Sequence, residues 1–167
     1  MKTAMPGILH KSDVGGVKLA LKNAAELEAA YADLAARLGN RVLLMPMVGK
    51  GVEISFGMTL DEQFGPVAMI GAGGVLIEMM GDRRFVLPPF GPREARRQID
   101  QLALRPLLDG KRAAKPANIG ALERAFTAFS VMAADLAGLI AEVDVNPLIA
   151  NAEGVVAVDA LIVSAVK

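Results

Sequence analysis

The stretch EVDVNPLIANAEGVVAVDA, residues 142–160, sets polar side chains into two otherwise apolar segments. Each segment alternates as a strand does, and residues 151–154 between them are typical of a tight turn. Alternate residues of a strand share a face, so Glu142, Asp144 and Asn146 are predicted to form a polar stripe. Because an unpaired charge among apolar residues is costly, we expect something to neutralise this stripe.

The turn also sets the register of this hairpin, and it places Asn146 directly opposite Asp159. Cross-strand neighbours have Cβ atoms about 4.5–5.5 Å apart, so the amide and the carboxylate could share one hard cation. Mg²⁺ suits such a place because it takes one or two protein oxygens together with waters and phosphate oxygens. Asp144 could contact groups that surround these ligands, or it could act on a reacting group. The alternative is a surface hairpin whose polar face is merely solvated.

The composition describes an ordinary globular chain of 167 residues, with 53% hydrophobic, 4% aromatic and 22% charged residues. We therefore expect one domain over residues 1–167 with an aliphatic core. Eighteen basic residues balance eighteen acidic ones, which leaves no overall field to attract nucleic acid or an anionic membrane.

The absence of cysteine excludes a disulfide framework, a thiolate nucleophile and a cysteine-based zinc site. No apolar run reaches the roughly eighteen residues of a membrane span, and the start MKTAMPG lacks the apolar region of a secretory signal. We expect a cytoplasmic protein without a membrane or nucleic-acid partner.

Hydrophobic periodicity indicates a mixed α+β fold, since helices and hairpin strands alternate without a regular βαβ rhythm. Helices are predicted at residues 24–38, 92–104 and 120–136. Strands are predicted at residues 14–22, 41–48, 51–60, 66–70 and 84–87, in addition to the final hairpin. Residues 41–48 could be a buried connector instead of a strand. The glycines of residues 71–74 favour a turn where backbone approaches a ligand or packs closely.

A second polar cluster, HKSDVGGVK, occupies residues 10–18. The backbone N–H groups of Gly15 and Gly16, with Lys11 nearby, could cradle phosphate. His10 is either a solvated side chain, a proton shuttle or a nucleophile that carries a phosphoryl group. Glu53, in the strand GVEISFG, lies either on the solvent face of a sheet or near a ligand.

Taken together, several motifs resemble the ATP-grasp domain of NDP-forming acyl-CoA synthetases, which are related to the ATP-grasp subunit of succinyl-CoA synthetase. The motifs are HKSDVGGV, GVEISFGMTLDEQFGPVAMIGAGGVLIEMMGD, LPPFGPREARRQID and the final hairpin, and they follow one another in the family's order. The resemblance implies an ATP-grasp fold of mixed and antiparallel sheets flanked by helices, which here begins after the family's N-terminal unit. It also implies ATP and Mg²⁺ as cofactors.

The resemblance further implies a reaction in which ATP phosphorylates a histidine on a CoA-binding partner subunit or domain. The phosphoryl group then passes to a carboxylic acid, and CoA displaces it to give the thioester, with ADP as a product. Because the CoA-binding portion lies outside these residues, we expect no complete reaction from this polypeptide alone.

The family's functional positions carry over residue by residue. Asn146 and Asp159 match the Mg²⁺ ligands, and Asp144 matches an acid that assists a second histidine. Glu53 matches an acid near the nucleotide.

In the N-terminal part of the chain, Lys2 falls where the family keeps a lysine for the nucleotide phosphates. His10 lies in the motif that is thought to relay the phosphoryl group in some members.

The loop Gly110-Lys111-Arg112-Ala113, followed by Asn118, departs from the family's usual G-x-R-G pattern, which affects how a partner would dock. Two other interpretations are therefore retained. One is a non-catalytic nucleotide-binding or regulatory module, as in a fused protein acetyltransferase. The other is an inert domain whose exposed apolar faces favour a homo-oligomer.

Overall fold

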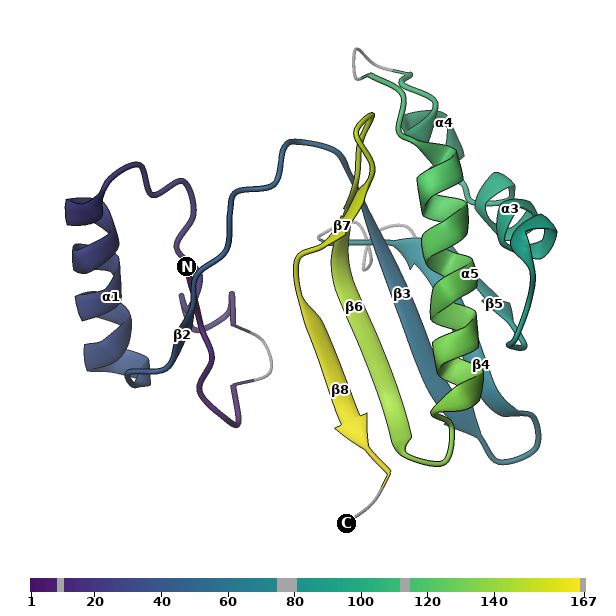
Figure 1. Ribbon diagram of the computed structural model, residues 1–167, viewed down its shortest axis with the longest axis horizontal. Helices are drawn as coiled ribbons and strands as arrows, with labels where there is room; N and C mark the ends of the chain where they lie inside the picture. Colours follow the sequence, from purple (N-terminus) through teal and green to yellow (C-terminus); the bar gives the residue numbers. More distant parts are fainter. Residues whose placement is uncertain (9–10, 75–80, 112–114, 166–167) are drawn as a thin grey trace. The chain divides into compact units, whose positions relative to one another are not determined.

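The computed structural model describes residues 1–8, 11–74, 81–111 and 115–165, and it confirms the α+β class. The chain forms two compact units, Met1–Met47 and Val48–Lys167. Figure 1 labels most helices and strands of the two units.

The first unit holds one helix and two very short strands. Strand β1 (Lys2–Thr3) pairs antiparallel with β2 (Val42–Leu43), and helix α1 (Ala24–Leu38) lies between them in the chain. Asn23 caps the helix by accepting a hydrogen bond from the backbone N–H of Glu26 at 2.9 Å.

Two predictions for this unit need correction. Residues 14–22 form a turn and an extended segment, with a single bridge between Val17 and Lys2, because the backbone hydrogen bonds of residues 11–16 close a local turn. Within residues 41–48 only Val42 and Leu43 form a strand, and Leu44 and Met47 are exposed rather than buried.

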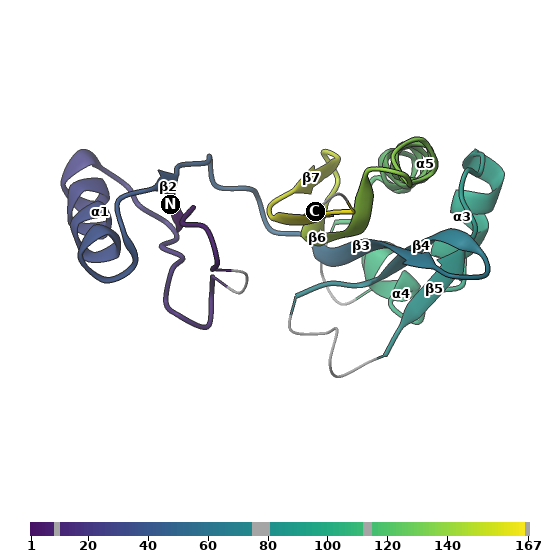
Figure 2. The same cartoon turned by 90° about the horizontal axis from the view of Figure 1, so that it is seen from below.

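The second unit is an antiparallel sheet covered by helices on one face. Its strand order is β5-β4-β3-β6-β7, and β8 also pairs with β6. The strands are β3 (Val52–Asp61), β4 (Gly65–Ala72), β5 (Arg83–Val86), β6 (Ile140–Ala150), β7 (Val155–Ala157) and β8 (Ala160–Ser164). Helices α3 (Pro92–Asp100) and α5 (Ile119–Asp135) lie on the same side of this sheet (Figure 2).

The predicted hairpin of residues 51–60 and 66–70 is confirmed by β3 and β4. The helix predicted at residues 120–136 is confirmed by α5. The prediction of one helix over residues 92–104 is wrong for the last turn. The helix ends at Asp100, and a separate short helix, α4 (Arg105–Leu108), follows with Pro106 in its first turn, where proline needs no N–H partner.

The core lies between the sheet and α5. Phe126 of α5 is fully buried, and its ring centroid lies 5.0 Å from that of Phe56 and 4.8 Å from that of Phe90. Ile54, Phe56 and Met58 of β3 all face this core. The intervening residues of β3, among them Glu53 and Gly57, therefore face away from the helices.

Candidate active site

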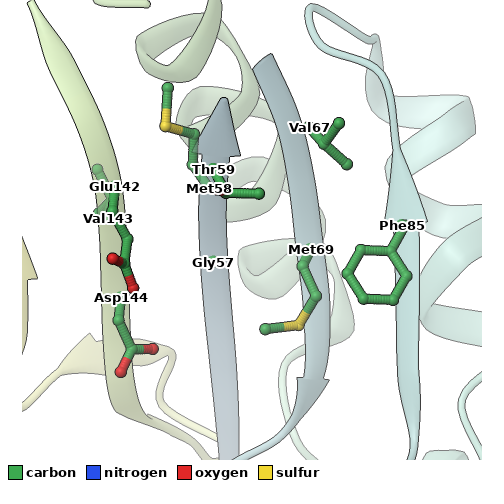
Figure 3. A pocket seen from close by; sticks show the side chains of 9 residues that line it. All are labelled: Gly57, Met58, Thr59, Val67, Met69, Phe85, Glu142, Val143 and Asp144. Carbon is green, nitrogen blue, oxygen red and sulfur yellow. The ribbon is translucent and has the colours of Figure 1, made fainter. Parts of the chain in front are cut away.

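The predicted polar stripe lies on the sheet face that points away from α3 and α5. On β6, Val143 is buried in the core, so its neighbours Glu142 and Asp144 project from the opposite face. Glu142 pairs with Thr59 of β3, and Asp144 pairs with Gly57. Figure 3 shows both carboxylates on this face of the sheet.

A shallow pocket runs along the same face beside Asp144. It is lined by Gly57, Met58, Thr59, Val67, Met69, Phe85, Glu142, Val143 and Asp144. Acidic side chains come from β6, while the side chains of Met69 and Phe85 extend the surface on β4 and β5 (Figure 3). The pocket thus has a charged side and an apolar side.

A β-bulge interrupts β6 at the next polar residue. Ile54 pairs with Leu148 and Phe56 pairs with Val145, so that Asn146 and Pro147 together oppose the single residue Ser55. Bulges of this kind re-aim side chains and are common next to active sites. The simple alternation that predicted one face for the whole stripe therefore ends before Asn146.

The bulge also changes which residues of β6 face the core. Before it Val143 is buried, and after it Leu148 and Ala150 are buried, so the inward set passes from odd to even residue numbers. The peptide bond between Asn146 and Pro147 is cis. Proline has no N–H for the ladder, which suits its place in a bulge.

The predicted register of the final hairpin is confirmed. Leu148 pairs with Ala157 on β7, and Val145 pairs with Ala160 on β8. Between these pairs, the backbone N–H of Asn146 donates to the carbonyl oxygen of Asp159 at 3.1 Å. Asn146 of β6 and Asp159, which lies between β7 and β8, are thus opposite each other. That their side chains share a metal ion stays a prediction.

Asn146 also contacts the glycine-rich loop. Its Oδ1 accepts a hydrogen bond of 3.0 Å from the backbone N–H of Gly74, 72 residues away in sequence. The same glycine lies against Glu53, since a Cβ atom placed on Gly74 would overlap Oε2 of that carboxylate. Glu53 and Asn146, which were singled out separately in the sequence, therefore meet around Gly74.

The remaining predicted residues belong to the first unit. Lys2 lies in β1, and Lys11 lies at the start of the turn that contains the glycine pair. The N–H groups of Gly15 and Gly16 donate to the carbonyl oxygens of Ser12 (3.0 Å) and Lys11 (2.7 Å). In this conformation both donors are already used within the turn.

The prediction for His10 concerns a residue that lies outside the described ranges. Sequence reasoning also missed how the neighbouring turn is held. Arg37 of α1 donates to the carbonyl oxygens of Val14 (3.1 Å) and Gly15 (3.2 Å), and it is paired with Asp33. The i,i+4 spacing of Asp33 and Arg37 on one helix indicates their ion pair. Nothing in the sequence indicates that Arg37 also contacts the turn.

Comparison with known families identifies this architecture. The ATP-grasp domain family matches residues 1–163. The chain belongs to the ATP-grasp family. The match covers both compact units, together with the bulged strand that carries Asn146.

Relatives of this ATP-grasp chain are ADP-forming acid–CoA ligases. It is 36% identical to the beta subunit of acetate–CoA ligase (ADP-forming) I of Pyrococcus furiosus, over 96% of the chain and 72% of that subunit. It is 37% identical to 4-hydroxybutyrate–CoA ligase (ADP-forming) of Nitrosopumilus maritimus, over 92% of the chain and 23% of that enzyme. The chain therefore spans about a quarter of one relative and nearly three quarters of the other.

Solved structures give the same assignment. The chain is similar to acetyl-coenzyme A synthetase 1 of Ca. Korarchaeum cryptofilum, with a TM-score of 0.88 and 35% sequence identity. The match covers 98% of the present chain and 75% of the Korarchaeum chain. That structure holds coenzyme A and Mg-AMPPCP. Among the residues described for the present chain, no helix is both long and apolar enough to cross a membrane.

Proposed function

We propose that this chain binds Mg²⁺ and ATP and takes part in phosphoryl transfer within an ADP-forming acid–CoA ligase. The observation that carries the proposal is the position of Asn146 opposite Asp159, joined by a backbone hydrogen bond of 3.1 Å. The family and the ligase relatives support it from an independent direction. We treat the two compact units as parts of one ATP-grasp domain, because the family match spans both.

Asn146 and Asp159 would hold the metal ion. Their amide and carboxylate oxygens are the kind of ligands that Mg²⁺ prefers, and this ion commonly takes only one or two protein groups. No three His, Cys, Asp or Glu side chains cluster for a metal among the residues that the structure describes. When bound, Mg²⁺ would neutralise negative charge on the phosphates.

The other predicted residues take supporting parts in this proposal. Glu53 would lie near the nucleotide, and Asp144 would orient or accept a proton from an imidazole that receives the phosphoryl group. His10 would be the second histidine of the relay.

Lys2 and Lys11 would bind phosphate oxygens through their ammonium groups. Because the N–H groups of Gly15 and Gly16 are engaged within their turn, phosphate binding there requires that this turn open.

The full reaction needs a partner. We propose a CoA-binding subunit or domain that carries the main phosphohistidine and, with this chain, converts a carboxylic acid, CoA and ATP to acyl-CoA, ADP and phosphate. The designation of the Pyrococcus relative as a beta subunit supports a separate partner chain. Since ATP and CoA are cytoplasmic metabolites, we place the assembly in the cytoplasm.

Calorimetric titration of the chain with Mg-ATP tests binding. We expect binding that Asn146→Ala and Asp159→Ala each weaken strongly, whereas Glu153→Ala, a carboxylate in the turn of the same hairpin, leaves it unchanged. Absence of heat and of thermal stabilisation with the wild-type chain would support the inert-domain interpretation instead.

Phosphoryl transfer is tested by adding a CoA-binding partner subunit and following the γ-phosphate label of ATP. We expect label on the partner, lost with Asn146→Ala or Asp159→Ala. Nucleotide binding without transfer of label would support the non-catalytic module.

A further inference from the structure

Among the described glycine-rich residues 71–74, Gly74 is the one whose backbone contacts the side chains of two site residues. Its N–H donates to Oδ1 of Asn146, and its α-carbon leaves the space that the Glu53 carboxylate fills. These two side chains come from different strands, β6 and β3.

The end of β4 and the residue that follows it are held to β3 by hydrogen bonds just before Gly74. The hydroxyl of Ser55 donates to the carbonyl oxygen of Ala72 at 2.8 Å, and the N–H of Gly73 donates to the carbonyl oxygen of Glu53 at 2.8 Å. A Cβ atom on Gly73 would lie about as close as 2.6 Å to the backbone of Ile54, so the loop packs directly on the strand. Gly74 is therefore presented to Asn146 from a fixed position.

The direction of this hydrogen bond fixes the orientation of the Asn146 amide. A backbone N–H can only donate, so the amide atom that faces Gly74 must be the oxygen. A carbonyl oxygen has two acceptor positions, and the N–H of Gly74 takes one of them. The second remains for a cation.

We infer that Gly74 is a positioning residue for the metal and nucleotide site. Its N–H holds the Asn146 oxygen in place for the cation, and its lack of a side chain lets the Glu53 carboxylate lie beside that oxygen. This inference rests on the proposed function and adds to it a residue that contacts neither substrate nor metal. Groups that orient a metal ligand typically contribute about 10- to 100-fold to metal affinity.

Gly74→Ala tests the inference. The backbone of Gly74 has φ +57°, where an L-residue is strained, and the three atoms nearest to the added methyl group all belong to the flexible end of Glu53. The variant keeps the backbone N–H, so its effect comes from displacing the Glu53 carboxylate. We expect a folded protein whose Mg²⁺ concentration for half-maximal AMPPCP binding rises about tenfold or more, the usual effect of disturbing a group beside a metal ligand.

Gly81→Ala is the matched control. Gly81 has φ +56°, nearly the same strain, and no described atom lies within 4 Å of a Cβ added there. We expect its Mg²⁺ requirement to stay within about twofold of the wild type. Equal Mg²⁺ requirements for Gly74→Ala and Gly81→Ala would overturn the inference, because backbone strain alone would then account for both.

A double-mutant cycle separates positioning from a general loss of stability. If the methyl group acts by displacing the Glu53 carboxylate, then Gly74→Ala adds little once Glu53→Ala is present, and the two effects are not additive. Full additivity in the Mg²⁺ titration would contradict the proposed steric role. If the wild-type chain fails to bind Mg-AMPPCP at all, the proposed function fails, which is a different result from equal behaviour of the glycine variants.

Discussion

Asp82 and Leu104 are joined by a hydrogen bond of 2.9 Å between the carboxylate and the backbone N–H, although 22 residues separate them. The second carboxylate oxygen of Asp82 accepts from the N–H of Ala103, also at 2.9 Å. The Asp82 side chain is buried, so it ties the segment before β5 to the turn that leads into α4.

We therefore expect Asp82→Ala to destabilise the second unit by about 1–3 kcal/mol, because two buried backbone donors lose their partner. Urea unfolding followed by circular dichroism measures this change. Glu62→Ala, at an exposed residue of the β3–β4 turn, is the control and should change the free energy of unfolding by less than about 0.5 kcal/mol. A stability of Asp82→Ala equal to that of the control would show that water replaces the carboxylate.

We expect a larger loss of stability from a substitution in the aromatic cluster of Phe56, Phe90 and Phe126, which lies between the sheet and α5. Phe126→Ala removes a fully buried ring that contacts Phe56 and Phe90, and we expect a loss of about 3–5 kcal/mol. Val131→Ala, on the same helix at a residue that is 45% exposed, is the comparison and should lie near zero. Thermal or urea unfolding of both variants checks the prediction, and similar values for the two would contradict the packing described for α5.

The Asp33 cluster predicts a dependence on pH in the first unit. Hydrogen bonds from Arg37 and then Lys18 hold the pKa of Asp33 well below its usual range. A carboxyl group with a lowered pKa in the folded state stabilises that state above its unfolded pKa, about 3.9, and the contribution is lost progressively as the pH falls.

Because Arg37 holds the turn at residues 14–15, hydrogen exchange at Gly16 reports on this contribution. We expect the wild type to protect this amide more than Asp33→Asn does at neutral pH, and the difference to shrink below about pH 4. A difference that stays constant down to strong acid would show that the Asp33 charge does not support the turn.

Asp144→Asn should separate binding from transfer. In the proposed function Asp144 acts on an imidazole rather than on the metal, so we expect Mg-ATP affinity within about twofold of the wild type and a fall in labelled partner of about 100-fold, the usual range for a general base. Calorimetry and transfer of the γ-phosphate label measure the two quantities. Equal losses of binding and transfer would indicate that Asp144 is itself a metal or nucleotide ligand.

Much of the second unit could be predicted because its segments are strongly periodic. The alternation of residues 51–60 and the helical spacing of residues 120–136 both gave elements within a residue or two of those observed. The register of Asn146 against Asp159 followed from the turn alone.

Other features depend on contacts that no local pattern contains. The apolar alternation of residues 14–22 predicts a strand, but Arg37 and local turn hydrogen bonds hold the start of this segment instead. Pro147 lacks a backbone N–H, and this is a sequence signal for a bulge. Which residues the bulge includes, however, depends on the pairing of β6 with the neighbouring strand β3. The hydrogen bond from Gly74 to Asn146 spans 72 residues and could not be predicted from spacing.

The bulge has a consequence for how this strand tolerates insertion and deletion. Losing either Asn146 or Pro147 would restore a regular pleat and turn one half of β6 over, so that Val143 or Leu148 would leave the core. A substitution within the strand therefore changes the packing of one side chain, whereas a change of length disrupts the packing of half the strand. During divergence of such sequences, the number of residues between Val143 and Leu148 should be harder to alter than most of the residues themselves.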